Sequence, residues 1–339
     1  MGVIKGVARE AALFLVLCYN NGYGYFVCFG ENLMELWVVL AIVAAVLMAL
    51  GVFFDNYITD VFFKGKLPQS RKVFSGPGYL IAALMVALVF GLQAITVGGA
   101  LWLVAAGAIF GLSLIPYYIA LAKDESTDVA IVEQLSPIFY LGWGWWLLHS
   151  EVSVLHLVAI AILMAAPALI ILSSHKRSQK TRLKMVGLML IKVAMGTLAN
   201  TLIVEVAPEI DFITMMFYVM IGRGLVDVAL AVWFKAWRKR FKYVMRRGGL
   251  KAWIAIVTDF VVWLGHEFVN YSALIIAPAM AMASAITKTL MPISVFLLGV
   301  VFTILWPSFG REKLDRKTVL VHLVATVLAV VGIILMQTA

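Results

Sequence analysis

Charge is scarce in this chain. Asp, Glu, Lys and Arg make up 13% of its 339 residues, against about 25% in an ordinary soluble domain. Cysteine is scarcer still: Cys18 and Cys28 form no CxxC pair, so neither a metal site nor a disulfide framework is indicated. Hydrophobic residues reach 63%, and the mean hydropathy is +1.01. Because so little polar surface cannot cover a globule in water, the composition excludes a soluble enzyme, a disordered protein and a disulfide scaffold.

The apolar residues are gathered into runs that can each cross a bilayer, which takes about 20 residues. Backbone groups in hydrocarbon must be satisfied within their own segment, so each run is expected to be a helix. We therefore predict an all-α polytopic membrane protein with ten transmembrane helices in two groups of five, at 34–56, 78–96, 99–121, 128–148, 153–173, 185–205, 212–234, 252–275, 279–305 and 318–337. Residues 11–29 are also apolar. They form an extra helix, lie in the interface, or precede a start at Met34.

Positive charge is gathered in the loops of one side. Most of the 27 Lys and Arg residues lie in four connections that share one side of this arrangement, at 61–76, 174–184, 235–251 and 305–317. The positive-inside rule predicts that these loops are cytoplasmic and that the chain lies in the cell membrane. The basic run within 235–251 follows a predicted span, so we interpret it as a topology anchor beside the lipid bilayer and expect no nucleic-acid partner.

The two groups of five helices resemble each other. Each contains the motif Y-x-A-L, beginning at Tyr118 and at Tyr271, followed by a helix with L-x-P, at Pro137 and Pro292. An odd number of spans in each repeat forces the two halves into opposite orientations. This is the inverted-repeat plan of secondary transporters, in which the ligand site lies near the midplane between the repeats.

Further matches place the boundaries of the repeats. In the first helix of each group, two positions recur at a constant offset, with Gly51 and Asp55 matching Gly196 and Asn200. The predicted organisation is an N-terminal segment at 1–33, a first five-helix repeat at 34–173, a basic linker at 174–184 and a second five-helix repeat at 185–339.

Each unit contains Y-x-A-L, then L-x-P in the next helix, then an acidic residue before a Gly/Ala-rich final helix. A chain with two such units resembles the EamA-type drug/metabolite transporters. The resemblance covers about 34–337. It implies ten helices, an alternating-access carrier, and a central cavity lined by helices 1, 3, 4, 6, 8 and 9. No cofactor is implied.

Charged residues inside the predicted spans are candidates for the site. An ionised group at the bilayer centre costs about 2.5–3.5 kcal/mol on insertion scales, so it usually faces a partner or a wet cavity. Glu133 and Lys288 each lie four residues before a proline, Pro137 and Pro292, whose ring frees the carbonyl of the fourth residue before it. We expect these prolines to act as hinges. Glu133 and Lys288 either bind opposite ends of a zwitterion and pair when the cavity is empty, or form a permanent structural ion pair.

The eighth span carries a polar stripe. Its members recur at helical spacing on one face and suit a substrate path: Asp259, Trp263, His266 and Asn270. Asp259 with His266 is also a candidate proton relay, and a polar seam between helices is the alternative to both roles.

Two further groups of charges complete the set. The first and sixth spans add the candidate cavity residues Asp55, Lys192 and Asn200, and Lys192 could instead pair with Asp259 or with Glu267. Arg223 and Asp227, four residues apart on one helix, are expected to neutralise each other.

The sequence thus predicts a secondary active transporter of a small polar or zwitterionic metabolite such as an amino acid, working as an exporter or exchanger. Transport would be coupled to protons or to a counter-substrate. The sequence does not decide between a monomer and a homodimer. No Walker A motif is present, so the chain itself does not use ATP. The alternatives are an intramembrane enzyme using Asp259, His266 and Glu267 in acid–base or metal chemistry, and a membrane scaffold or channel. We expect neither a metal nor an enzymatic activity, because HE at 266–267 lacks the second histidine of HExxH.

The extra crossing at 11–29 has a direct test. If it crosses, Lys5 and Arg9 join the basic loops in the cytoplasm. We therefore expect a side-specific reporter fused to the N-terminus to be active inside the cell, and activity outside would contradict the eleventh span.

Overall fold

A computed structural model describes most of the chain between Leu33 and Leu305. The described residues are 33–121, 132–133, 135–147, 149, 153–155, 157–159, 161–162, 165, 179–277, 280–305 and short pieces between 320 and 335. Within these residues the regular structure is helical and no strand occurs. Seven of the helices are long and apolar enough to cross a membrane. The all-α, multi-pass character is therefore confirmed, whereas ten spans and an inverted repeat remain predictions.

The helices follow the predicted order. They are α2 (Leu33–Tyr57), the π-helix η1 (Ile58–Phe63), the 3-10 helix η2 (Pro68–Arg71), α3 (Lys72–Phe90), α4 (Val97–Leu121), α6 (Ser136–Leu147), α8 (Gln179–Val206), the 3-10 helix η3 (Ala207–Glu209), α9 (Phe212–Trp233), α10 (Lys235–Ile276) and α11 (Met280–Leu305). The predicted spans at 99–121, 212–234 and 279–305 agree with α4, α9 and α11 within two residues. The segment 11–29 and most of the spans at 153–173 and 318–337 lie outside the described residues.

The second span lies earlier in the chain than predicted. The expected helix at 78–96 is α3, which begins at Lys72 and ends at Phe90. Arg71 and Lys72, counted in the sequence as part of a basic cytoplasmic loop, are 4% and 1% exposed. Hydropathy places such residues in loops because it ignores their partners. Here both cations meet buried carboxylates, so the helix can begin with them inside the protein.

The basic run before the eighth span is also helical. α10 begins at Lys235, and Gly249 interrupts it with φ 55° and ψ −144°, a conformation that suits glycine because it has no Cβ. The short helix before this break buries one apolar face, with Phe241, Val244 and Met245 packed in a cluster with Phe63. The predicted loop at 235–251 is therefore an amphipathic helix whose basic side chains face outward.

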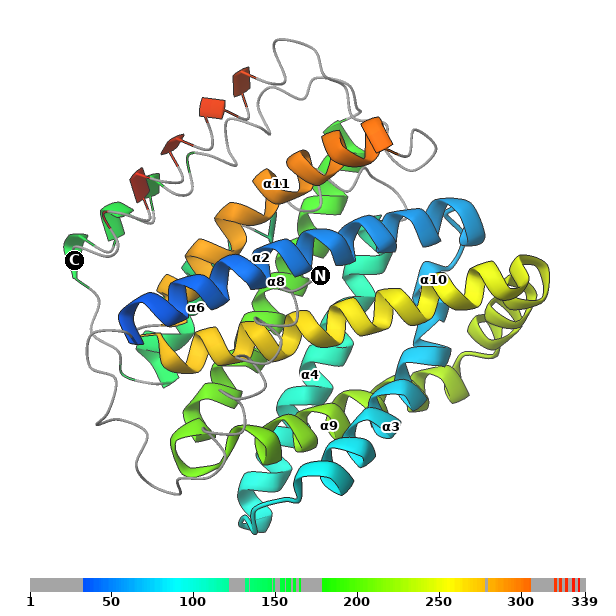
Figure 1. The fold of residues 1–339 in the computed structure, drawn as a ribbon, viewed down its shortest axis with the longest axis horizontal. Helices are drawn as coiled ribbons and strands as arrows, with labels where there is room; N and C mark the ends of the chain where they lie inside the picture. Colours follow the sequence, from blue (N-terminus) through cyan, green and yellow to red (C-terminus); the bar gives the residue numbers. More distant parts are fainter. Residues whose placement is uncertain are drawn as a thin grey trace, which may run out of the picture.

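Helices from the two predicted halves pack against each other (Figure 1). α2 packs along α10 and α11, whereas α8 packs along α4 and α6. A third set joins α9 to α3 and α4. In this arrangement the first helix of each predicted half contacts the third and fourth helices of the other half, and these contacts enclose the centre of the bundle.

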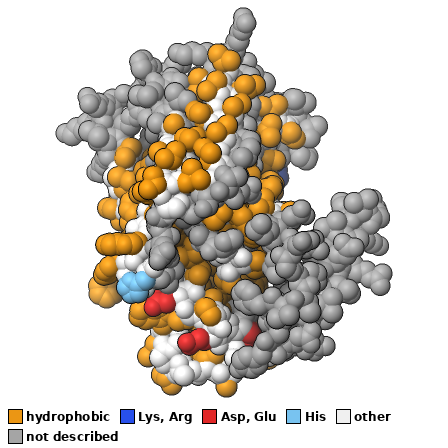
Figure 2. All heavy atoms as spheres, turned by 90° about the vertical axis from the view of Figure 1, so that its left-hand side faces the viewer, with side chains coloured by type: hydrophobic (Ala, Val, Ile, Leu, Met, Phe, Trp, Pro, Cys, Tyr) orange, Lys and Arg blue, Asp and Glu red, His pale blue; other side chains and the backbone are white. Residues whose placement is uncertain are grey.

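The outer surface of the membrane-spanning helices is largely apolar. On α3 an outward stripe recurs at helical spacing, and its members are more than half exposed: Ile81, Leu84, Met85 and Leu88. The face in Figure 2 is mostly apolar where it is described, with a histidine and acidic side chains toward its lower end. Contiguous apolar surface of this kind marks contact with lipid or protein, and it agrees with a membrane-embedded chain.

Glycines bring α9 against its two neighbours. A Cβ at Gly107 of α4 would collide with the carbonyl of Val219, and one at Gly222 of α9 would collide with the carbonyl of Val104. On the other side, a Cβ at Gly76 of α3 would lie 2.8 Å from the backbone nitrogen of Val228. Small residues at such crossings let helix backbones approach closely in a membrane, where packing replaces the hydrophobic driving force.

These crossings should not tolerate side chains. We expect Gly222→Leu to lower the free energy of unfolding by about 1–3 kcal/mol or more, because overpacking forces the two backbones apart. Gly142→Leu on α6 is the matched control, since nothing lies within 4 Å of a Cβ built there. Thermal unfolding of the purified protein in detergent measures both. Equal melting temperatures for the two variants would contradict the close crossing.

Candidate functional site

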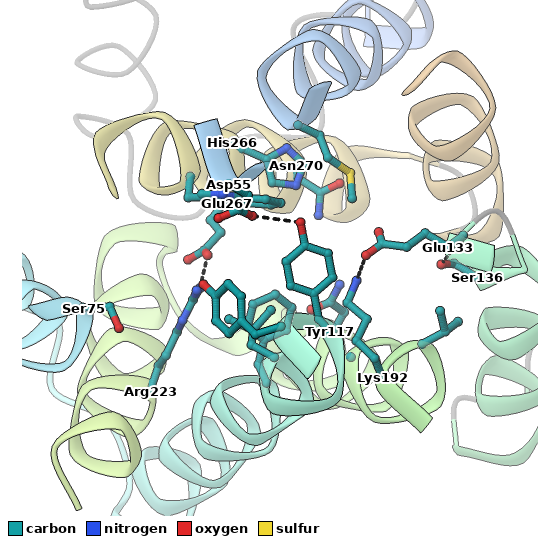
Figure 3. Close-up of a pocket in the computed structure, with 18 of the residues that line it drawn as sticks. Asp55, Ser75, Tyr117, Glu133, Ser136, Lys192, Arg223, His266, Glu267 and Asn270 are labelled. Atoms are coloured by element: carbon teal, nitrogen blue, oxygen red, sulfur yellow. Dashed lines mark hydrogen bonds and ion pairs between the residues drawn. The ribbon is translucent and has the colours of Figure 1, made fainter. Parts of the chain in front are cut away.

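A cavity lies at the centre of the bundle, between α2, α3, α4, α6, α8, α9, α10 and α11. Its volume is about 80 Å³. This is room for about five to eight waters or a small solute. The nine substrate-site residues predicted from the sequence all line it: Asp55, Glu133, Lys192, Asn200, Asp259, Trp263, His266, Asn270 and Lys288. Figure 3 shows how several of them converge from different helices.

Glu133 is held by two lysines. Lys192 of α8 forms an ion pair with its Oε1, and Lys288 of α11 places Nζ 2.9 Å from its Oε2. The predicted contact between Glu133 and Lys288 is thus present. Lys192 pairs with Glu133, and not with Asp259 or Glu267. Because three elements meet at one carboxylate, this cluster joins both predicted halves.

At the other end of the cavity one arginine faces two carboxylates. Arg71 forms an ion pair with Asp55, and its Nη1 lies 3.5 Å from Oδ2 of Asp259. The Tyr117 hydroxyl donates a hydrogen bond to Oδ2 of Asp55 at 2.8 Å, and the Arg71 guanidinium lies 4.7 Å from the ring centroid of Tyr118. Sequence reasoning missed Arg71.

The predicted pair of Arg223 and Asp227 is wrong. Arg223 pairs with Glu267 of α10, and Asp227 pairs with Lys72 of α3. A separation of four residues places both side chains on one side of α9, where each finds a better partner on a neighbouring helix. Glu267, which the sequence placed beside the polar stripe, therefore also lines the cavity.

Ring contacts and hydrogen bonds surround these two ion pairs. The Arg223 guanidinium lies 4.1 Å from the Tyr79 ring centroid, and the Tyr79 hydroxyl donates to Oε1 of Glu267 at 3.1 Å. Lys72 also donates to the carbonyl of Gly111 at 2.8 Å, and Ser75 donates to Oδ2 of Asp227 at 2.6 Å. Hydrogen bonds that satisfy the remaining lone pairs reduce the cost of burying such charges.

Two neutral polar groups complete the wall. Asn200 donates to the hydroxyl of Tyr140 at 2.6 Å and accepts from the hydroxyl of Tyr271 at 3.1 Å. His266 places Nδ1 2.9 Å from the carbonyl oxygen of Ala44. Because a carbonyl only accepts, Nδ1 carries the proton, and Nε2 of a neutral ring is then an acceptor. The four residues of the predicted stripe on the eighth span all line the cavity from α10.

The two predicted hinges differ in their surroundings. Pro137 is the second residue of α6 and is buried, and the turn before it is tight, with Leu135 N donating to Val132 O at 3.1 Å. The proline therefore lies in the first turn of α6, which begins at Ser136, and not in the middle of a helix. Pro292 lies within α11, which continues past it. The hinge function of both stays a prediction.

No protein-family model and no curated protein matches the chain. Among solved structures, 28 chains match. One of them, described only as the crystal structure of a protein, has a TM-score of 0.60 and 12% sequence identity, and the match covers 90% of this chain and 96% of that chain. This likeness shows the fold alone. The shared fold extends over nearly the full length of both chains.

The described lining of the cavity is balanced in charge. It contains four cations and four carboxylates: Arg71, Lys192, Arg223 and Lys288, with Asp55, Glu133, Asp259 and Glu267. Within the described part of the chain, no three His, Cys, Asp or Glu side chains form a group that could hold a metal ion. The arrangement can bind a charged or strongly polar solute, because each ion pair can exchange its partner for a group on the ligand.

The sharing of Glu133 predicts an unequal response to mutation. Glu133→Gln leaves two ammonium groups facing each other and should lower the free energy of unfolding by about 3–5 kcal/mol. Lys288→Met should cost less, because Lys192 still neutralises Glu133. Thermal unfolding in detergent measures both, with Glu205→Gln, an exposed position on α8, as the control. A greater loss for Lys288→Met than for Glu133→Gln would contradict the shared pairing.

Proposed function

We propose that the chain is a secondary active transporter with alternating access, of the EamA type, that carries a small polar or zwitterionic metabolite such as an amino acid. The observation that carries this proposal is the central cavity. All nine residues chosen from the sequence line it, although they come from helices far apart in the chain. A buried polar cavity surrounded by long apolar helices is the arrangement that a polar solute needs in order to cross a bilayer.

The packing of the helices supports an inverted repeat. α2 contacts α10 and α11, and α8 contacts α4 and α6, so that each predicted half supplies its first helix to the other. The repeat-related residues Asp55 and Asn200 also have similar surroundings, since each accepts a hydrogen bond from a tyrosine, Tyr117 or Tyr271, on the third helix of its own half.

Ion pairs across the halves support alternating access. Glu133 belongs to the first predicted half and both of its lysines to the second, while Arg71 of the first half faces Asp259 of the second. A charged ligand can replace either partner in such a contact, so occupation of the cavity can change how tightly the halves are joined. This is the differential interaction that a ligand needs to shift a conformational equilibrium.

The acidic and imidazole side chains are less suited to catalysis. Glu267 is paired with Arg223, Asp259 contacts Arg71, and Nδ1 of His266 is bonded to the carbonyl of Ala44. Within the described residues, the three candidates form no ion pair or hydrogen bond with one another. A general base in such a mechanism is usually oriented by a neighbouring acidic group. We therefore favour the carrier over the intramembrane enzyme, and the ion pairs across the halves favour it over a rigid scaffold or an open channel.

Orientation follows from the basic segments. We propose that the side carrying the short helix before Gly249 faces the cytoplasm, because its exposed surface is rich in Lys and Arg.

Flux through purified protein in liposomes tests the function. We expect flux of at least one small polar metabolite from a broad panel loaded inside the vesicles. Glu133→Gln and Lys288→Met should each reduce that flux roughly ten-fold or more, about 1.4 kcal/mol, because both remove a charge from the cavity wall. Glu205→Gln should transport normally. No flux for any compound would overturn the carrier, and normal flux in a folded Glu133→Gln or Lys288→Met variant would overturn the role of the cavity.

A further inference from the structure

The charges in the cavity are segregated. At one end Lys192 and Lys288 share a single carboxylate, Glu133. At the other end Asp55 and Asp259 share a single guanidinium, Arg71. Counted over the residues that the structure describes, the first group carries one positive charge in excess, and the second carries one negative charge in excess. Arg223 and Glu267, the remaining charges of the wall, cancel each other.

Tyr117 lies between the two ends (Figure 3). Its hydroxyl donates to Asp55 at 2.8 Å, and the ammonium of Lys192 lies 5.7 Å from its ring centroid. The tyrosine thus stands between Asp55 and Lys192, and these two groups form no ion pair with each other. Each excess charge therefore stays available to a ligand.

Polar atoms without partners occur at both ends. Among the described residues, Oδ1 of Asp259 is buried without a hydrogen-bond partner, and its Oδ2 lies 3.5 Å from Nη1 of Arg71. At the positive end the buried hydroxyl of Ser284 likewise has no hydrogen-bond partner in the described part of the chain. Ser284 lies one helical turn before Lys288 on α11, which places both side chains on one face. A buried polar atom without a partner is costly, and a ligand that supplies the partner removes that cost.

We propose that the cavity binds an amino-acid zwitterion in one orientation, with its carboxylate between Lys192 and Lys288 and its ammonium on Asp259. The carboxylate competes with Glu133 for the lysines and accepts from the Ser284 hydroxyl, while the ammonium donates to Oδ1 of Asp259. This assignment rests on the proposed function of the cavity as the substrate site. It differs from the hypothesis that Glu133 and Lys288 bind opposite ends of the ligand, because here both side chains lie at the carboxylate end.

Chemically blocked amino acids test the two ends separately. The probes are the twenty common amino acids in three forms: free, N-acetylated, which keeps only the carboxylate, and carboxamide, which keeps only the ammonium. We expect at least one free amino acid to raise the melting temperature of the purified full-length protein, and both blocked forms of that amino acid to bind roughly ten-fold or more weakly. Stabilisation by no free amino acid, or equal binding of either blocked form, would overturn the proposal.

Two substitutions then assign the orientation. Asp259→Asn should weaken binding of the free amino acid and leave the N-acetylated form unchanged, because only the ammonium contacts Asp259. Lys288→Met should weaken the free and N-acetylated forms and leave the carboxamide unchanged. Lys192→Met replaces Lys288→Met if that variant does not fold, and Asp259→Glu should restore part of the lost affinity. Glu205→Gln is the control for all forms. The reverse pattern, or equal losses for every form, would overturn the orientation.

The outcome separates this proposal from the function on which it rests. Flux of other metabolites through liposomes, without binding of any free amino acid, would overturn the zwitterion and leave the transporter standing. Binding of a free amino acid with the expected pattern, but without flux of any compound, would support the zwitterion site and contradict the transporter.

Discussion

An ionised side chain away from water needs an opposite charge within reach, and the centre of this bundle is built around that requirement. Among the described residues, five cations and five carboxylates are buried or nearly buried there: Arg71, Lys72, Lys192, Arg223 and Lys288, with Asp55, Glu133, Asp227, Asp259 and Glu267. Four of their six ion pairs join the two predicted halves of the chain, and the pairs Arg71–Asp55 and Arg223–Glu267 each lie within one half. The charges therefore specify which helices are neighbours, a selectivity that apolar contacts between lipid-facing helices cannot supply.

Two kinds of contact hold the helices together. Along α9 the contacts are close, with glycines such as Gly107 and Gly222 bringing backbones together. Around the cavity they are polar, and each depends on partners that a ligand or water could replace. Close crossings leave little freedom for sliding, whereas ion pairs can be exchanged. The bundle thus combines a tightly packed side at α3, α4 and α9 with an interior whose contacts can rearrange.

Local patterns were sufficient to predict the helices and the lining of the cavity. Hydropathy located α4, α9 and α11, and the charges inside apolar runs identified the residues that converge. Pairing was harder, because it depends on which helices become neighbours: Arg223 and Asp227 are close in sequence but find partners elsewhere. Arg71 and Lys72 were missed because hydropathy places cations in loops. Charge balance gives a usable signal, since the charged candidates named from the sequence comprise five acids and three bases, which is two cations short of balance.

The ion pair between Arg71 and Asp55 also fixes the length of the connection between α2 and α3. It runs through a π-helix, a turn with left-handed backbone at Lys64 and Leu67, and one 3-10 turn before Arg71 meets Asp55. One residue inserted or removed would rotate the start of α3 by about 100° relative to Asp55. Most surface connections tolerate such changes in evolution. This one should accept substitutions far more readily than insertions or deletions, although it lies at the end of the bundle.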